Sequence, residues 1–352
     1  MAQATVSNIV KELAASGVLQ TSPSTRSGRR AQHITLAHAV GLVVGVHISQ
    51  RHMRVMLSDV NREVLAENHM PLAHRHRADN ELDKASLLLV DMLESGGHQL
   101  SDVLAIGLAI AAPVRTDTGL IAADGLLSGW DGVAIADVLQ RRLSRPVYVH
   151  RAADAIALAE WRHGAAMSDR HSIVLDIGQG ISSGLILNGQ PYRGNTGIAG
   201  ELGHVRVRDD GLLCRCGKRG CLDTVAAGPA ILSGVNDDER HMKLTDVVAR
   251  ALAGDAMFVR TIADAGRDIG RALADVCTML DLESVVVGGE LARAGELLLG
   301  PIRFALESGL IVRGQGVPVV RAGVLGDRAA VLGATIIAIG HTAKVGEAAS
   351  PW

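Results

Sequence analysis

The chain has 352 residues, of which 48% are hydrophobic and only 2% aromatic, so it can bury sizeable cores built mainly from Ala, Val, Leu and Ile. Its 35 Lys and Arg residues and 37 Asp and Glu residues leave a formal net charge of -2, which excludes an overall attraction to nucleic acid or membranes. No basic-then-apolar leader opens the sequence, and its longest apolar runs, such as residues 329–339, are too short to cross a membrane. We therefore expect a cytoplasmic protein of two or three domains with no membrane partner.

An amphipathic helix is predicted near the start of the chain, in the stretch ATVSNIVKELAAS. Val6, Ile9, Val10 and Leu13 recur at the spacing of one helix face, and polar side chains occupy the other face. Gly17 is placed to end this helix.

Two short strands are predicted next, at 18–20 and 33–36, around a polar, basic tip at 22–30. From periodicity alone, a helix and hairpin packed on the main body and a DNA-binding element fit equally well. In a DNA-binding element, short polar side chains of the helix reach base edges and phosphates, and arginines of the tip hold the backbone or enter a minor groove. The candidate DNA-binding residues are Thr5, Ser7, Asn8, Lys11, Arg26, Arg29 and Arg30.

From Gly41 the pattern becomes that of an α/β protein, and near residue 150 a similar pattern starts again. We expect two similar halves with a ligand cleft between them, the last helix returning to the first half and the tail 341–352 forming a loose end. The predicted strands are 41–48, 53–60, 63–72, 103–114, 146–150, 172–178 and 181–189, and the predicted helices are 83–93, 133–143, 154–162, 294–306 and 328–339.

A metal site is predicted in the stretch ELGHVRVRDDGLLCRCGKRGCLD, residues 201–223. One imidazole and three thiolates in C-x-C-x4-C spacing complete a tetrahedral shell, which suits structural Zn2+ with no open position for a catalytic water. The alternative is a loop whose cysteines are merely buried, but core cysteines do not usually crowd among glycines. Cys277, in an apolar helical run, is interpreted as a core residue. The predicted zinc ligands are His204, Cys214, Cys216 and Cys221.

The same stretch resembles the signature of the ROK family, which joins sugar kinases, sugar-responsive transcriptional repressors and uncharacterised relatives. Its E-L-G-H and C-R-C-G-K-R-G-C-L-D follow the family pattern E-x-G-H and C-x-C-G-x-x-G-C-L-E, and agreement extends over about residues 40–340. The resemblance implies an α/β, duplicated actin-like, ribonuclease-H-like fold of the sugar kinase type.

The resemblance also identifies the first 38 residues with the recognition helix and wing of a partial winged helix-turn-helix, ATVSNIV being the helix and SGRR the wing. In a complete domain further helices precede the recognition helix and bury its apolar side. We therefore expect that the true start lies further upstream or that the domain has decayed, and operator binding by the chain as written is an open prediction.

Two departures from the family's kinases argue against phosphoryl transfer. The first phosphate loop of the kinases, D-x-G-G-T, reads His47 to Arg51 here and has neither the carboxylate nor the glycines. The family's N-D-A-N reads Arg151-Ala152-Ala153-Asp154, so the catalytic base falls on Ala152, which cannot accept a proton. Losing a positioned base typically lowers the rate by about 10^2 to 10^4. Asp154 is interpreted as a helix N-terminal residue.

The second glycine-rich loop is better kept, and Gly178 and Gly180 form a possible phosphate loop. The alternative, which we favour, is that the fold needs glycines here for a tight turn.

The sugar side of the cleft is half intact. Glu201 and His204 match family positions that meet sugar hydroxyls, whereas Asp223 is one methylene shorter than the usual Glu. Arg151 replaces part of the Asn-Asp pair that grips the sugar, which suggests an anionic ligand; the alternative is an arginine paired with a nearby carboxylate. The candidate effector-binding residues are Glu201, His204, Asp223 and Arg151.

Together these observations favour a ROK-type transcriptional regulator that responds to a sugar or sugar-derived effector and has no kinase activity. We expect a repressor. Its expected partners are operator DNA, the effector and further copies of itself in a homodimer or higher homo-oligomer. The alternatives are a ROK sugar kinase and a ligand-binding relative that has lost DNA binding. The predicted domains are 1–38, 39–150 together with the helix 328–340, and 151–327.

Overall fold

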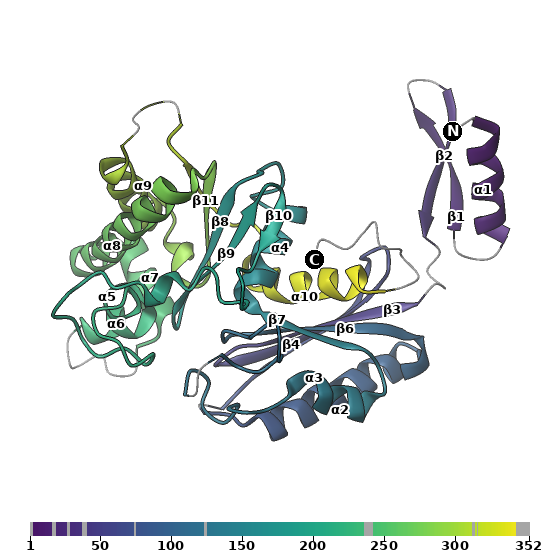
Figure 1. Cartoon of the computed structure of the whole chain (residues 1–352), viewed down its shortest axis with the longest axis horizontal. Helices are drawn as coiled ribbons and strands as arrows, with labels where there is room; N and C mark the ends of the chain where they lie inside the picture. The colour runs from purple at the N-terminus through teal and green to yellow at the C-terminus, as the bar shows by residue number, and fades with distance from the viewer. Residues whose placement is uncertain are drawn as a thin grey trace.

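Two five-stranded sheets with the same strand order form the body of the protein (Figure 1). The computed structural model describes residues 3–15, 19–26, 29–36, 41–73, 75–122, 125–235, 242–311, 314 and 316–342. In each sheet, three consecutive antiparallel strands form a meander, and two further strands add in parallel to the first of them. This repeated topology is the duplication expected from the sequence, and it makes the body an α/β protein of two related lobes.

The first sheet has the order β5-β4-β3-β6-β7 and the second β10-β9-β8-β11-β12. The central strand β3 is buried along its whole length because its sequence, LVVGVHI, is almost continuously apolar, as a strand covered on both faces requires. The strands are β3 (Leu42–Ile48), β4 (His52–Asp59), β5 (Val64–Pro71), β6 (Val103–Ile110), β7 (Val147–Arg151), β8 (Ser172–Ile177), β9 (Ile181–Leu187), β10 (Gln190–Tyr192), β11 (Ser284–Gly288) and β12 (Val319–Ala322).

Each sheet has helices on both faces. On one face of the first sheet lie α2 (Ala78–Ser95) and α3 (Ile135–Leu143), and on one face of the second lie α7 (Leu244–Leu252), α8 (Ala256–Leu280) and α9 (Glu296–Gly309), beside the short α5 (Asp223–Ala226) and α6 (Gly228–Ser233). The sequence did not predict α7 or most of α8, and α2 begins earlier than expected.

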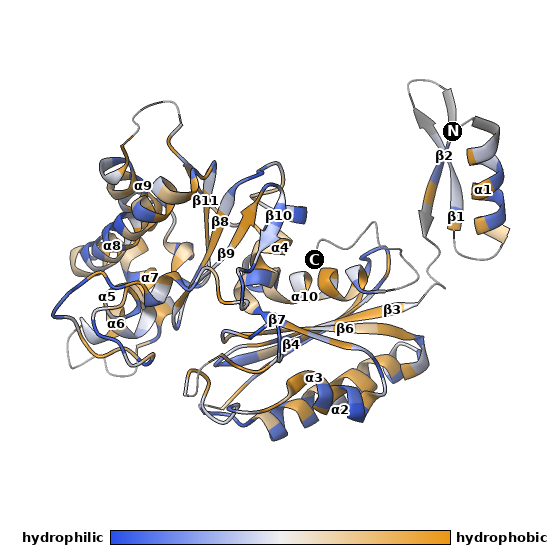
Figure 2. Ribbon diagram, in the orientation of Figure 1, coloured by the Kyte–Doolittle hydropathy of each residue, from blue (hydrophilic) through white to orange (hydrophobic). Residues whose placement is uncertain are grey.

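The remaining two helices are exchanged between the lobes. Helix α4 (Ala152–His163) follows the last strand of the first sheet but packs on the second sheet, and α10 (Ala329–Gly340) follows the last strand of the second sheet but packs on the first. The two helices also pack on each other between the sheets, and α10 is apolar along most of its length (Figure 2). The predicted return of the last helix to the first lobe is confirmed.

The helix crossing has no room for side chains at its closest point. A Cβ at Gly333 of α10 would overlap the backbone carbonyl of Ala155 of α4, and a Cβ at Gly107 of β6 would overlap that of Ala334. Close approach of two backbones is a use for which glycine is suited.

The N-terminal segment is a helix, α1 (Gln3–Ala15), and a hairpin of β1 (Leu19–Arg26) and β2 (Arg29–Leu36) (Figure 1). The helix is confirmed, but the predicted strand bounds and polar tip were wrong, because pairing continues to Arg26 opposite Arg29. Both strands of this ribbon are exposed to water, so they need no apolar face. The polar residues that were predicted to form the tip therefore continue the strands. Gly17 lies outside the described residues.

The end of the described chain is packed, contrary to the predicted loose tail. The ring of His341 stacks on Tyr148 of β7 with 3.9 Å between centroids, and Thr342 is buried. The remaining tail, 343–352, lies outside the described residues. Within the described part of the chain, no helix combines the length and apolarity needed to cross a bilayer.

We predict that Gly333→Ala lowers the free energy of unfolding by about 2 kcal/mol or more, since the new methyl group must push α4 and α10 apart. The matched control is Gly300→Ala in α9, where the nearest atom to a Cβ is a side-chain oxygen at 3.8 Å. Alanine favours a helix over glycine by about 0.5–1 kcal/mol, so the control should be neutral or stabilising. Denaturant unfolding of both variants checks this, and equal effects at the two positions would contradict the close crossing.

Candidate functional site

A cavity of about 380 Å³ lies between the lobes. Its walls come from the turn between β3 and β4, the equivalent turn between β8 and β9, the start of α4, and the segments that follow β11 and precede α10. Because the two turns join the first and second strands of duplicated sheets, the same local structure faces the cavity from both sides.

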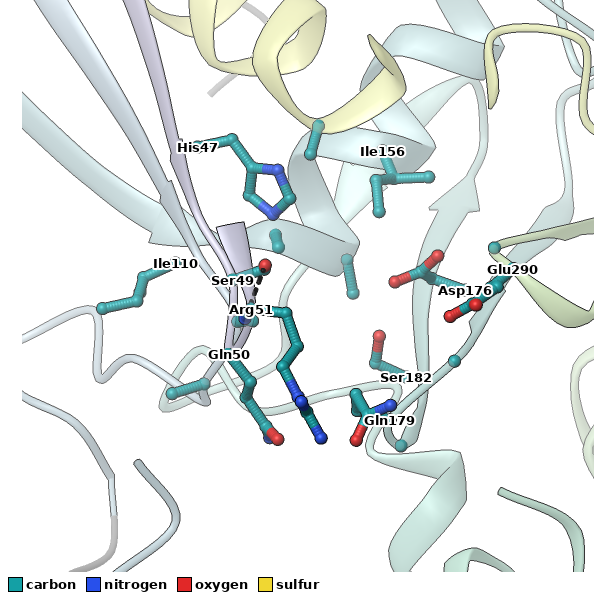
Figure 3. Close-up of a pocket in the computed structure, with 18 of the residues that line it drawn as sticks. His47, Ser49, Gln50, Arg51, Ile110, Ile156, Asp176, Gln179, Ser182 and Glu290 are labelled. Atoms are coloured by element: carbon teal, nitrogen blue, oxygen red, sulfur yellow. Dashed lines mark hydrogen bonds between the residues drawn. The ribbon is translucent and has the colours of Figure 1, made fainter. Parts of the chain in front are cut away.

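The first turn, Ser49 to His52, is held by its own serine. Ser49 N donates to His52 O at 2.9 Å, and Ser49 Oγ accepts from the backbone N–H groups of Arg51 at 3.2 Å and His52 at 3.0 Å. This compact turn directs the side chains of Gln50 and Arg51 into the cavity (Figure 3).

His47 stands at the end of β3, where the resemblance places the carboxylate of the kinases. Burial, with the nearby His52 and Arg54, lowers the pKa of His47 to about 3, so its ring is neutral at physiological pH. Its Nδ1 is buried without a partner among the described residues. A neutral imidazole carries no negative charge with which to organise a metal-nucleotide complex.

The second turn contains the predicted phosphate-loop glycines, and both line the cavity. Gly178 N donates to Gly180 O at 3.0 Å, while Gly178 O accepts from Gly228 N at 2.8 Å. These hydrogen bonds close a tight turn against the start of α6. They use backbone groups only, and a Cβ at Gly178 would meet no atom within 4 Å, so the turn by itself does not require glycine at that position.

Asp223, a candidate effector residue, braces this turn. Its Oδ1 accepts from Ile181 N at 2.8 Å, and its Oδ2 lies 3.3 Å from Arg215 Nη2 and 4.0 Å from His204 Nδ1. Burial raises the pKa of Asp223, and the Arg215 guanidinium opposes that rise. Both oxygens of Asp223 thus already have partners within the protein.

Arg151 is almost completely buried at the junction of β7 and α4. Its Nη2 donates to Asp154 Oδ1 at 2.5 Å and its Nε to Oδ2 at 3.1 Å, while its Nη1 donates to Glu201 Oε1 at 2.6 Å. The carbonyl of Ala199 also accepts from Nη2. These contacts agree with the alternative interpretation of Arg151, an arginine paired with carboxylates, and they commit one oxygen of Glu201 within the protein.

Ala152 occupies the first position of α4, is buried and lines the cavity. Two carboxylates of this region, Asp154 and Glu201, are both bound by the adjacent residue Arg151. Asp154 lies in the first turn of α4, as expected, and also lies 3.4 Å from Arg193 Nε.

The opposite wall of the cavity is acidic, which the sequence did not indicate. Asp176 is the penultimate residue of the strand β8, and burial together with Asp327 and Glu290 raises its pKa to about 6. Figure 3 shows Asp176 and Glu290 across the cavity from Arg51. The only signal in the sequence was an aspartate directly before a glycine loop, and the other two residues come from remote segments.

The four predicted metal ligands come together. His204, in the short helix η3 (Leu202–His204), and the three cysteines place one ligand atom each within 4.8 Å of one another. Cys216 Sγ lies 3.6 Å from Cys221 Sγ, and Cys214 Sγ lies 3.5 Å from His204 Nδ1. Such a His/Cys3 group could hold a metal ion. Cys277 is separate from it and buried in α8, as predicted.

The candidate DNA-binding side chains of α1, Thr5, Ser7, Asn8 and Lys11, are exposed. The apolar residues Val6, Ile9 and Leu13 are also partly exposed. Arg26, Arg29 and Arg30 lie on the hairpin strands next to the tip, and their side chains lie outside the described part of the structure.

Comparison with known proteins identifies the family. A family model described as "ROK family" matches residues 43–341. The chain belongs to the ROK family. Its fold is accordingly the actin-like fold of ROK sugar kinases and regulators, as expected from the cysteine motif.

Relatives of both kinds are similar to this ROK chain. The DNA-binding transcriptional dual regulator NagC of Escherichia coli strain K12 is 27% identical over 338 residues, covering 92% of this chain and 82% of NagC. A glucokinase of Halalkalibacterium halodurans is 32% identical over 277 residues, covering 72% of this chain and 84% of the glucokinase. The crystal structure of a ROK family transcriptional regulator, a homologue of the E. coli MLC protein, matches with a TM-score of 0.79 at 22% identity, covering 98% of this chain and 90% of that one.

We predict that Arg151→Ala lowers the free energy of unfolding by roughly 3 kcal/mol, because it leaves a buried carboxylate with only the more distant Arg193. Removing both charges in Arg151→Ala/Asp154→Ala should restore part of this loss, since no uncompensated charge remains. Denaturant unfolding of the single and double variants measures the coupling. A single-variant loss below about 1 kcal/mol would contradict a committed ion pair.

The raised pKa of Asp176 makes stability depend on pH. The folded protein binds this proton more tightly than the unfolded chain between pH 3.8 and about 6, so the contribution of Asp176 to stability falls as pH rises through that window and is constant above it. Asp176→Asn should therefore be more stable than the wild type by roughly 1–3 kcal/mol at pH 8, and the gain should vanish near pH 4. Thermal unfolding of both proteins across this range checks it; an equal gain at both pH values would count against the raised pKa.

Proposed function

We propose that this protein is a transcriptional regulator of the ROK family that binds a sugar or sugar-derived effector in the cleft between its lobes and has no kinase activity. The observation that carries the proposal is the pair at the start of α4: Ala152 at the position of the catalytic base, and Arg151 bonded to Glu201. A general base must lie within hydrogen-bond reach of the hydroxyl it deprotonates. The methyl group of Ala152 cannot serve, and Arg151 holds the neighbouring carboxylates as ion pairs.

The N-terminal segment supports a regulator over a kinase. The match to the ROK regulator structure covers 98% of this chain and so leaves about 7 of its 352 residues unmatched, which means that it extends into the first 38. We assign α1 as the recognition helix and the β1–β2 hairpin as the wing of a partial winged helix-turn-helix. Its DNA contacts come from Thr5, Ser7, Asn8, Lys11, Arg26, Arg29 and Arg30.

The effector contacts we assign are the free oxygen of Glu201 and the cavity-facing edge of His204, whose Nδ1 is turned toward Cys214. Asp223 supports them by holding the second turn. An effector can regulate only if it prefers one arrangement of the lobes over another. The cavity has walls from both lobes, so its occupant contacts both. A homodimer that matches a two-fold symmetric operator completes the proposal.

We assign the His/Cys3 group as a structural Zn2+ site. Three thiolates and an imidazole suit zinc in closed tetrahedral sites, and all four side chains are already gathered. Bound zinc would tie the loop 205–221 to η3 and keep the His204 ring oriented toward the cleft.

The purified protein should contain one zinc ion per chain by elemental analysis, and a strong chelator should lower its melting temperature. Cys216→Ser should lose zinc, with affinity weakened by more than about tenfold. Cys277→Ala, which removes a cysteine from α8 instead, is the control and should keep its zinc. Equal zinc contents in the two variants would refute the assignment.

DNA binding is tested by fluorescence anisotropy of this chain on the DNA that flanks its own gene and on random duplex, at several salt concentrations. We expect tighter binding to the flanking DNA, with affinity that falls steeply as salt rises. Arg29→Gln should flatten the salt dependence by about one unit of slope, whereas Arg260→Gln on the exposed surface of α8 should not change it. No preference for the flanking DNA would reject the regulator and favour a ligand-binding relative without DNA binding.

A sugar kinase is the second candidate, because the glucokinase of Halalkalibacterium halodurans is the more identical of the two compared sequences at 32%. That identity extends over 72% of this chain and speaks for the shared fold. Arg151 and Ala152 at the start of α4 argue against phosphoryl transfer to a sugar.

A further inference from the structure

The arginines that line the cavity differ in how they are used. Four of the five are ion-paired: Arg54 with Glu67 at 2.5 Å, Arg151 with Asp154 and Glu201, Arg215 with Asp223 at 3.3 Å, and Arg293 with Asp327 at 2.6 Å. Arg51 is the exception: its side chain has no hydrogen-bond or ion-pair partner among the described residues. Of the arginines in the cavity lining, Arg51 is therefore the one whose charge no side chain in the described part of the chain neutralises.

The place of Arg51 makes that charge available to a ligand. The serine-capped turn fixes its backbone, while its side chain is exposed and points into the cavity (Figure 3). Gln179 and Ser182 point into the same space from the equivalent turn of the second lobe and add hydrogen-bond donors. His47, with its unpartnered Nδ1, lies on the same side as Arg51 and is uncharged.

The opposite wall determines how a charged ligand would be oriented. The acidic side chains of Asp176 and Glu290 disfavour an anion at this wall, but their oxygens can accept hydrogen bonds from hydroxyl groups. An anionic group is therefore favoured at the Arg51 end, and the hydroxyl-bearing part of the same molecule is favoured toward the acidic wall.

We propose that the cleft binds a ligand with an anionic oxygen group, phosphate or carboxylate, which is held by Arg51 between the two turns. The sequence suggested Arg151 as the residue that binds an anionic ligand. Arg151 is instead neutralised by Asp154 and Glu201, so this role falls to Arg51. A planar guanidinium binds phosphate or carboxylate through two parallel hydrogen bonds, which gives both affinity and orientation. This inference rests on the proposed function in taking the cavity as the effector site.

The test is calorimetric titration of the whole chain with glucose, glucose 6-phosphate, gluconate, inorganic phosphate and AMPPNP. Inorganic phosphate is the minimal probe, because it carries neither sugar nor base. We expect anionic probes to bind at least tenfold more tightly than glucose. Gain with glucose 6-phosphate or gluconate identifies a sugar phosphate or sugar acid as the source of the anion, and gain with AMPPNP alone identifies a nucleotide.

Arg51→Gln should lower the affinity for the anionic probes at least tenfold. Arg51→Lys keeps the charge but not the planar pair of donors, and it should retain part of the affinity gain over glucose. Arg141→Gln removes the same charge from the exposed surface of α3, outside the cavity, and should change nothing. The proposal is overturned if no anionic probe gains over glucose, or if the gain survives in Arg51→Gln. The DNA-binding test uses no small ligand, so a failure here is distinguishable from a failure of the proposed function.

Discussion

The close crossing of α4 and α10 is the constraint on which the rest of the structure depends. Each helix continues from the last strand of one lobe and packs on the sheet of the other, so the two lobes cannot separate without separating the helices. Gly333 and Ala155 allow backbone-to-backbone contact at the crossing, and Gly107 and Gly45 let α10 lie flat on the first sheet. Interfaces packed in this way have few arrangements open to them, and a change of lobe angle is then a discrete event rather than a gradual one.

The same crossing determines the chemistry of the cleft. It sets the first turn of α4 at the cavity wall, where Arg151 and Ala152 sit side by side. A buried arginine needs partners, and Arg151 at the end of β7 takes Asp154 from the first turn of α4 and Glu201 from the second lobe. Arg151 thus has two effects: it takes up one oxygen of Glu201, an effector contact in the proposed function, and it adds an ion pair between segments 50 residues apart. Arg51, which has no ion-pair partner among the described residues, and the carboxylates of Asp176 and Glu290 also line the cavity.

The sequence predicted the local structure well and the pairing of side chains poorly. Strands such as β3 and β8 were evident because strands buried on both faces are continuously apolar, and the His/Cys3 group was evident because its four ligands lie within 18 residues of one another. The pairing of Arg151 with carboxylates was only one of two interpretations of this residue, because Glu201 lies 50 residues away in the sequence. Asp176 reaches the cavity from the end of β8, and Glu290 and Arg293 reach it from the segment after β11. More than 100 residues separate the two segments, and no spacing rule joins them. The hairpin strands are longer than the sequence predicted, because polar residues can continue a two-stranded ribbon that faces water.

The proposed function requires that this cleft bind a ligand without phosphorylating it, which a coupled ADP-release assay with ATP, Mg2+ and a panel of hexoses, pentoses and amino sugars would measure. We expect no sugar-dependent ADP release above the background of the assay for any sugar in the panel. Sugar-dependent turnover at a rate typical of kinases, about 1–100 s⁻¹, would contradict it and would require a base other than residue 152.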